Sequence, residues 1–152
     1  MEPRARLHFI VDEPDQVIVI RAIGEVMPAT FIDQVFEKLS AIPEPWMFNR
    51  LFDVRRWAHR LGAETVHALA VRWRELTAGQ IYLARLAVVT YDHGTLYRTP
   101  APSDYFPEET VCYFDDFHEA SHWLRAPDPA AYIKGLADKP ANHQTYGGII
   151  IE

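Results

Sequence analysis

Two apolar stretches, LARLAVVTYD at residues 83–92 and TVCYFDD at residues 110–116, decide the fold of this chain. Each is a short, continuous apolar run that ends in an acidic side chain. The second run leads directly into FHEASHWLR at residues 117–125, which has the spacing of a short amphipathic helix. Continuous apolar runs of this length are typical of parallel strands that are covered on both faces. The segment therefore predicts a parallel α/β sheet whose last strand is followed by a helix.

Toward the N-terminus, the pattern adds three strands and two helices. Strands are expected at residues 7–11, 17–23 and 48–54, and the turn signal at residues 13–15 indicates that the first two form an antiparallel hairpin. Helices are expected between Pro28 and Ile42 and between Gly62 and Gly79. The predicted fold is α/β, with a single mostly parallel five-stranded sheet, an antiparallel first edge strand, and helices packed on the sheet through right-handed crossovers.

The composition is that of one ordinary globular domain. The chain has 152 residues, of which 49% are hydrophobic and 24% charged. A chain of this length buries about 70% of its unfolded surface and needs no disulfide or metal for stability. Cys112, the only cysteine, lies inside an apolar run, which favours a small buried hydrophobe over a reactive thiol. The net charge of −6 gives no general attraction to phosphates, so we expect no nucleic-acid partner.

The two ends of the chain give weaker signals. The N-terminus, MEPRARLHFI, lacks a signal-peptide pattern, and no apolar run approaches about 20 residues, so we expect a cytoplasmic protein without a transmembrane segment. Residues 1–126 are expected to form the domain, and residues 127–152 a C-terminal extension with a short helix. The extension ends in GGIII at residues 147–151, which is compatible equally with an added edge strand and with a disordered end. The tail or an exposed sheet edge could also support a homodimer.

Three segments resemble the STAS-like family of anti-sigma-factor antagonists, in its SpoIIAA-like branch. They are VIVIRAIGEVMPATF at residues 17–31, RLAVVTYD at residues 85–92 and VCYFDDFHEASHWL at residues 111–124. With the element order, the resemblance covers residues 7–126. It implies a bacterial regulatory or binding module related to lipid-binding Sec14-type domains, without catalysis and without a cofactor. Typical members carry a phosphorylatable serine after the third strand; here Arg55 to Ala58 fill that loop, and Thr65 is the nearest hydroxyl.

The segment RRWAHR at residues 55–60 is predicted to lie between a strand end and a helix start. Ligands of open α/β sheets bind outside the carboxyl ends of the strands, and the first N–H groups of a helix favour an anion there. Arginine and histidine could hold a carboxylate or phosphate beside a tryptophan wall, although a solvated loop with weak surface ion pairs is the alternative. The site would engage a protein partner or a small apolar or anionic ligand. The candidate ligand-binding residues are Arg55, Arg56, Trp57, His59, Arg60, Asp92, His93 and Tyr97.

Two patterns make an enzyme the alternative to a binding module. His118 to His122 match the H-E-x-x-H pattern of zinc hydrolases, with Asp128 as a possible third ligand, but Arg125 stands where many such enzymes need glycine. Asp92 and His93 could form an acid–base pair at the strand ends, although no motif places a Ser or Cys nucleophile beside them. Asp116 is expected to cap the last helix rather than bind a cation.

Overall fold

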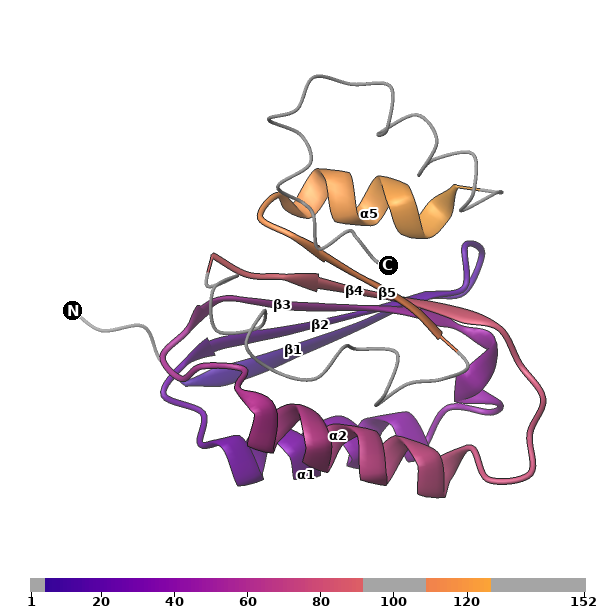
Figure 1. Cartoon of the computed structure of the whole chain (residues 1–152), viewed down its shortest axis with the longest axis horizontal. Helices are drawn as coiled ribbons and strands as arrows, with labels where there is room; N and C mark the ends of the chain where they lie inside the picture. The colour runs from indigo at the N-terminus through magenta and orange to yellow at the C-terminus, as the bar shows by residue number, and fades with distance from the viewer. Residues whose placement is uncertain (1–4, 92–108, 127–152) are drawn as a thin grey trace.

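The structure is a computed structural model that describes residues 5–91 and 109–126. Figure 1 shows a single twisted sheet with two helices on one face and one helix on the other. The elements are β1 (Arg6–Asp12), β2 (Val17–Gly24), α1 (Pro28–Ser40), the 3₁₀ turn η1 (Pro45–Met47), β3 (Asn49–Trp57), α2 (Ala63–Leu76), β4 (Ala84–Val89), β5 (Glu109–Phe114) and α5 (Phe117–Arg125). No helix in these two ranges is long and apolar enough to cross a bilayer.

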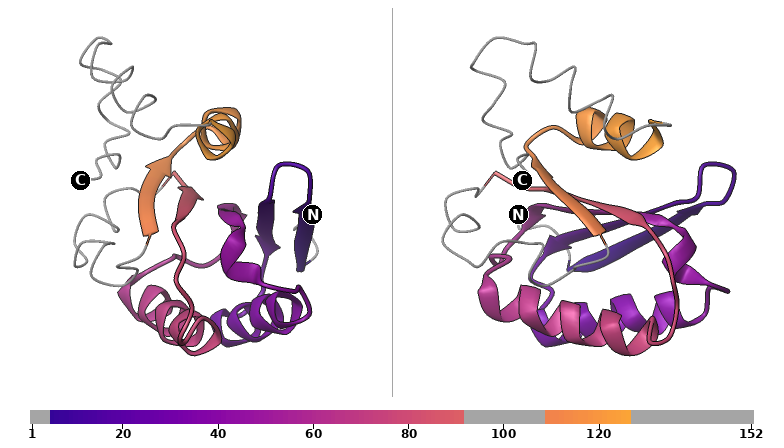
Figure 2. Two further views of the ribbon diagram at one scale, coloured as in Figure 1. Left: turned by 90° about the vertical axis from the view of Figure 1, so that its right-hand side faces the viewer. Right: turned by 45° about the vertical axis from the view of Figure 1, so that its right-hand side comes forward.

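The sheet has the predicted architecture. Its strands follow one another in the order β1-β2-β3-β4-β5, with β1 antiparallel to β2 and every other neighbouring pair parallel. The fold class predicted from the sequence is therefore confirmed. Helices α1 and α2 lie side by side on one face, and α5 covers β3, β4 and β5 on the other (Figure 2). Helix α1 connects β2 to β3, and α2 connects β3 to β4. Crossover connections of the same handedness that each lead to the next strand in the same direction place their helices on the same face of the sheet.

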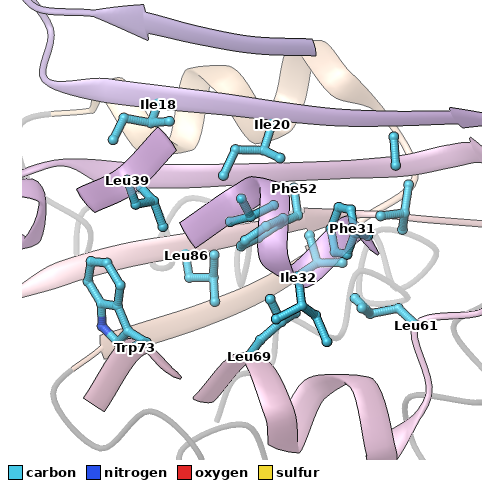
Figure 3. Close-up of a cluster of buried hydrophobic side chains, with 14 of the residues drawn as sticks. Ile18, Ile20, Phe31, Ile32, Leu39, Phe52, Leu61, Leu69, Trp73 and Leu86 are labelled. Carbon is cyan, nitrogen blue, oxygen red and sulfur yellow. The ribbon is translucent and has the colours of Figure 1, made fainter. Parts of the chain in front are cut away.

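The face covered by α1 and α2 holds the larger core. Alternation along β2 sends Ile18, Ile20 and Ala22 to this face, where they join apolar side chains of both helices. Figure 3 shows Phe31 and Ile32 of α1 and Leu69 of α2 in this cluster. Both faces of β2 are buried, which explains why its sequence is a continuous apolar run rather than an alternating one.

The opposite face of the sheet is covered by α5 and holds a second core. Ala120, Trp123 and Leu124 of this helix pack with the alternate residues of the strands, among them Cys112. Cys112 is buried, as its apolar surroundings predict. The helix begins where Asp116 accepts hydrogen bonds from the backbone N–H groups of His118 and Glu119, at 2.7 and 3.3 Å. The predicted capping role of Asp116 is confirmed.

A buried ion pair joins β3 to β5 on the face of the sheet that α1 and α2 cover. The side chains of Arg50 and Glu109 are 2% and 0% exposed, and the guanidinium of Arg50 binds both carboxylate oxygens of Glu109. The guanidinium carbon also lies 3.7 Å from the ring centre of Trp73 on α2. The indole Nε1 of Trp73 donates to the Tyr82 hydroxyl, which in turn lies 3.4 Å from Glu109 Oε2. The pair thus ties α2 to two strands of the sheet.

Removing one partner of this pair should damage stability more than removing both. Glu109→Leu leaves the Arg50 guanidinium inside the core without its carboxylate, and we expect the free energy of unfolding to fall by about 3–5 kcal/mol. The double variant Arg50→Met/Glu109→Leu replaces the pair with apolar side chains, so its loss should be smaller. Urea denaturation of the three proteins measures this. A double variant that is less stable than Glu109→Leu would contradict the expectation.

Candidate functional site

An open cavity of about 620 Å³ lies at the carboxyl edge of the sheet, beside the start of α5. It is formed where β2, β3, β4 and β5 approach their ends, which is the edge at which parallel α/β sheets bind ligands. We call it the carboxyl-edge cavity. The described residues that line it are Arg21, Asp53, Arg55, Arg56, Tyr91, Asp115, Asp116, Phe117 and His118.

A β-bulge places two consecutive arginines at this cavity. Along the β2–β3 pair, Arg21 lies opposite Asp53 and Ile23 lies opposite Arg56, so β3 uses one residue more than β2 over this stretch. An extra residue in one strand breaks the alternation of side chains between the two faces. Arg55 and Arg56 consequently both line the cavity, and the next residue, Trp57, turns to the core on the other face.

The carboxylate of Asp53 holds two of these arginines in place. Its Oδ1 accepts a hydrogen bond from Arg55 Nε at 2.9 Å, and its Oδ2 accepts bonds from Arg55 Nη2 at 2.9 Å and from Arg21 Nε at 3.1 Å. The backbone N–H of Arg55 adds a fourth bond, at 3.3 Å, to Oδ1. The Asp53 side chain is only 4% exposed, whereas both arginines reach the cavity surface. One buried anion therefore fixes cations from two neighbouring strands.

The surroundings of Asp53 and Arg55 favour the charged states of these two side chains. Burial alone would raise the pKa of Asp53, but the hydrogen bonds from Arg55 and the charges of Arg55 and Arg21 hold it below its ordinary value. The hydrogen bonds with Asp53 raise the pKa of Arg55, against the opposing effect of burial. The Asp53 carboxylate accordingly remains ionised at neutral pH and accepts bonds at both oxygens, so it is poorly suited to act as a base or nucleophile.

Aromatic rings complete the walls of the cavity. The guanidinium carbon of Arg21 lies 4.7 Å from the ring centre of Phe117, at the start of α5. The guanidinium carbon of Arg55 lies 6.0 Å from the ring centre of Tyr91, which follows β4. Contacts of this kind are favourable for cations and keep the planar guanidinium groups oriented. The result is a surface where arginine N–H groups alternate with apolar ring faces.

The structure brings some of the predicted ligand residues together and separates others. Arg55 and Arg56 line the carboxyl-edge cavity, although they belong to β3 and not to a loop after it. The prediction that Trp57 forms a loop wall is wrong. Trp57 is the last residue of β3 and 6% exposed, its Nε1 donates to the backbone oxygen of Val26 at 2.7 Å, and its ring packs on Phe31.

The other predicted residues lie beside the cavity or beyond the described ranges. His59 is half-buried, with Nε2 3.4 Å from Glu25 Oε2, and Arg60 is exposed; neither lines the carboxyl-edge cavity. Asp92, His93 and Tyr97 lie outside the described residues. Asp92 nevertheless follows Tyr91 directly in the sequence, and Tyr91 does line the cavity.

The zinc-hydrolase pattern falls on α5. His118 and His122 are both exposed on this helix, and Asp128, the possible third ligand, lies outside the described residues. Within residues 5–91 and 109–126, no group of three His, Cys, Asp or Glu side chains is arranged to hold a metal ion. His118 instead contributes to the rim of the carboxyl-edge cavity.

The sequence interpretation missed several cavity residues, and one of them left a recognisable signal. Arg21 interrupts the apolar stretch VIVIRAIG of β2, and a charge within a buried strand needs a partner. The partner is Asp53, which is next to last in the strand predicted at residues 48–54 and lies in the middle of β3. Tyr91 and Phe117 gave no such signal, because their position at the cavity depends on how three separate strands end.

Comparison with known proteins identifies no relative of this chain. No family model, no curated protein and no solved structure matches the chain.

Stability should depend on the ionisation of Asp53. Because its folded pKa is lowered, its contribution is complete above the unfolded value, near pH 4, and is lost as the pH falls through the folded value. Asp53→Asn should lower the free energy of unfolding at neutral pH by about 1–3 kcal/mol. The variant should also lose less stability than the wild type on acidification below about pH 4. Denaturant unfolding at several pH values measures both effects.

Asp33 offers a matched control. It forms an ion pair with Arg72 on the helical face, but its side chain is 74% exposed. Asp33→Asn should change the free energy of unfolding by no more than about 0.5 kcal/mol. Equal effects of the two substitutions would contradict a special role for Asp53.

Proposed function

We propose that this protein is a STAS-like, non-enzymatic binding module whose carboxyl-edge cavity takes a small anionic ligand with an apolar part. The observation that carries the proposal is the cluster of Arg21, Arg55 and Arg56 at a cavity that Tyr91 and Phe117 also line, with Arg21 and Arg55 fixed by the buried Asp53. In the same proposal the module is cytoplasmic and regulatory, and ligand binding alters its contact with a protein partner.

The arginines supply the anion-binding chemistry. A guanidinium has five N–H donors in a planar fork, of which Asp53 takes one from Arg21 and two from Arg55. Arg21, Arg55 and the exposed Arg56 line a cavity large enough for a small molecule, and Arg55 also has a hydrogen bond with Tyr91. Forks of this kind bind carboxylates and phosphates with two parallel hydrogen bonds. An anion with two or three oxygens therefore matches the donors.

The rings of Phe117 and Tyr91 supply the apolar contact. Both stand beside an arginine at the cavity, so a ligand held by the guanidinium groups would place its carbon skeleton against a ring. A few charged groups on an otherwise apolar wall are typical of small-molecule sites. This combination favours an anion such as an aryl phosphate or carboxylate over inorganic phosphate alone.

The chemistry of the described lining supports binding more than catalysis. The oxygens of Asp53 accept four hydrogen bonds from arginine N–H groups, and Asp116 caps α5. No serine, threonine, cysteine or lysine belongs to the described lining. The enzyme alternatives, a metal-dependent hydrolase and a His–Asp enzyme, depend on Asp128, Asp92 and His93, which lie outside the described residues.

Phenyl phosphate is a suitable first probe, because it joins a dianion to an aromatic ring. We expect saturable binding by isothermal titration calorimetry, with NMR shift changes that concentrate at Arg21, Tyr91 and Phe117. Arg21→Gln should raise the Kd by about tenfold, which corresponds to the loss of one charged hydrogen bond. Arg56→Ala, which leaves the Asp53 hydrogen bonds intact, should also weaken binding.

The surface arginine Arg72, on α2 across the sheet, provides the control. Its guanidinium pairs with the exposed Asp33, so Arg72→Ala should leave the Kd unchanged. The proposal fails if phenyl phosphate, benzoate and inorganic phosphate all fail to bind at about 10 mM, a concentration at which even a single weak anion contact is measurable. It also fails if Arg72→Ala weakens binding as much as Arg21→Gln.

A further inference from the structure

Strand β1 is an edge without the usual protection. Among the described residues it pairs with β2 alone, and all seven of its residues do so without a register shift. Edge strands are commonly guarded by a bulge, a proline, a lysine or short length, because their free N–H and C=O groups can pair with another strand. The sequence of β1, RLHFIVD, has no Pro, Gly or Lys. It therefore offers a regular strand edge to a partner.

The exposed side chains of this edge are partly apolar. Ile10 is 49% exposed and Val11 is 38% exposed, one on each face of the sheet. Helix α5 covers β3, β4 and β5 (Figure 2) and reaches the end of β1 through Arg125, whose Nη2 lies 2.8 Å from Asp12 Oδ2. Ile10 thus lies on a part of the sheet face that no described helix covers, at the edge of the second core, which α5 covers.

The charges of β1 are complementary to those of a second, antiparallel β1. If a two-fold axis passes at Phe9, Arg6 of each copy lies opposite Asp12 of the other, and His8 lies opposite Ile10. Residues directly opposite one another in an antiparallel pair share a face, so Arg6 of one copy would lie beside Asp12 of the other at both ends of the new ladder. The Asp12 carboxylate already accepts a hydrogen bond from Arg125 Nη2 at 2.8 Å, and Arg6 would add a second cation beside it. Moving the register by two residues in either direction removes this match. Only this register places Arg6 opposite Asp12, and a shift of two residues in one direction places His8 opposite Asp12 instead.

We propose that β1 pairs with β1 of a second copy of this chain, so that the two sheets join edge to edge in a two-fold dimer. A groove of about 510 Å³ runs beside this edge between the start of β1 and one face of α1, which carries Thr30, Gln34, Glu37 and Lys38. Figure 1 shows α1 beneath the sheet, where it contacts β1, so pairing of the strands would bring the α1 helices of both copies toward the two-fold axis. Isologous pairing of this kind closes on itself and produces no fibre.

Sedimentation equilibrium of the full chain over a range of concentrations tests the proposal. We expect a monomer–dimer equilibrium, and Ile10→Lys should raise the dimer Kd by about tenfold or more, because the substitution introduces two charges at the strand edge of the dimer. The double variant His8→Asp/Ile10→Lys should restore the dimer, since each lysine would then face an aspartate of the other copy. Val71→Lys, at a similarly exposed apolar residue of α2, is the control and should leave the Kd unchanged.

The alternative occupants of the edge give different results. A full chain that remains monomeric at about 1 mM, beyond the range of stable homodimers, overturns the proposal. A monomer that dimerises only when residues 147–152 are removed also overturns it, since the isoleucine-rich tail would then occupy the edge. A dimer that is indifferent to Ile10→Lys places the interface elsewhere. If Ile10→Lys unfolds the protein, Arg6→Glu at the exposed end of the strand provides the same test, with the same weakening expected.

Discussion

The carboxylate of Asp53, buried in the middle of the sheet, is the interaction on which the carboxyl-edge cavity depends. A carboxylate with an exposed fraction of 4% is costly to desolvate unless it is paired. Arg55, two residues further along β3, and Arg21, directly opposite on β2, provide the compensation. In return the carboxylate orders two side chains that would otherwise sample many rotamers in solvent. A ligand that meets these arginines finds them already oriented, so less entropy is lost on binding.

Strand β3 carries a second buried charge on its other face. Arg50 lies three residues before Asp53, so alternation sends it to the α1 and α2 side, where it meets Glu109 and the ring of Trp73. The central strand of this sheet is therefore held by an ion pair on each face. The pair at Arg50 lies inside the core and ties together elements of the fold. The trio at Asp53 opens onto a cavity, which is why only the latter supports a binding role.

The sequence predicted the strands and helices well because the sheet is buried on both faces. The apolar runs of β2, β4 and β5 and the helical spacing of α1 and α5 follow directly from that burial. The site was harder to predict. RRW at residues 55–57 appeared as a polar loop, since its two adjacent arginines break strand alternation, and only a bulge allows both to face one side.

The contact between Arg21 and Asp53 could not be predicted from the sequence pattern either. Arg21 and Asp53 lie on separate segments, and only the register of β2 against β3 brings them together. A rule that every charge in an apolar strand needs an opposite charge on a neighbouring strand would have singled out both. The part of the site that follows β4, where Asp92, His93 and Tyr97 were predicted to act, remains a prediction.

A crystal structure of the full protein with phenyl phosphate would show whether Asp53 orients the arginines for an anion. Phosphate oxygens should lie within hydrogen-bond distance of Arg21 and Arg55, both still bonded to Asp53, with the phenyl ring against Phe117 or Tyr91. Arginine side chains that leave Asp53 for solvent, or a ligand bound elsewhere with the carboxyl-edge cavity empty, would contradict this role of Asp53.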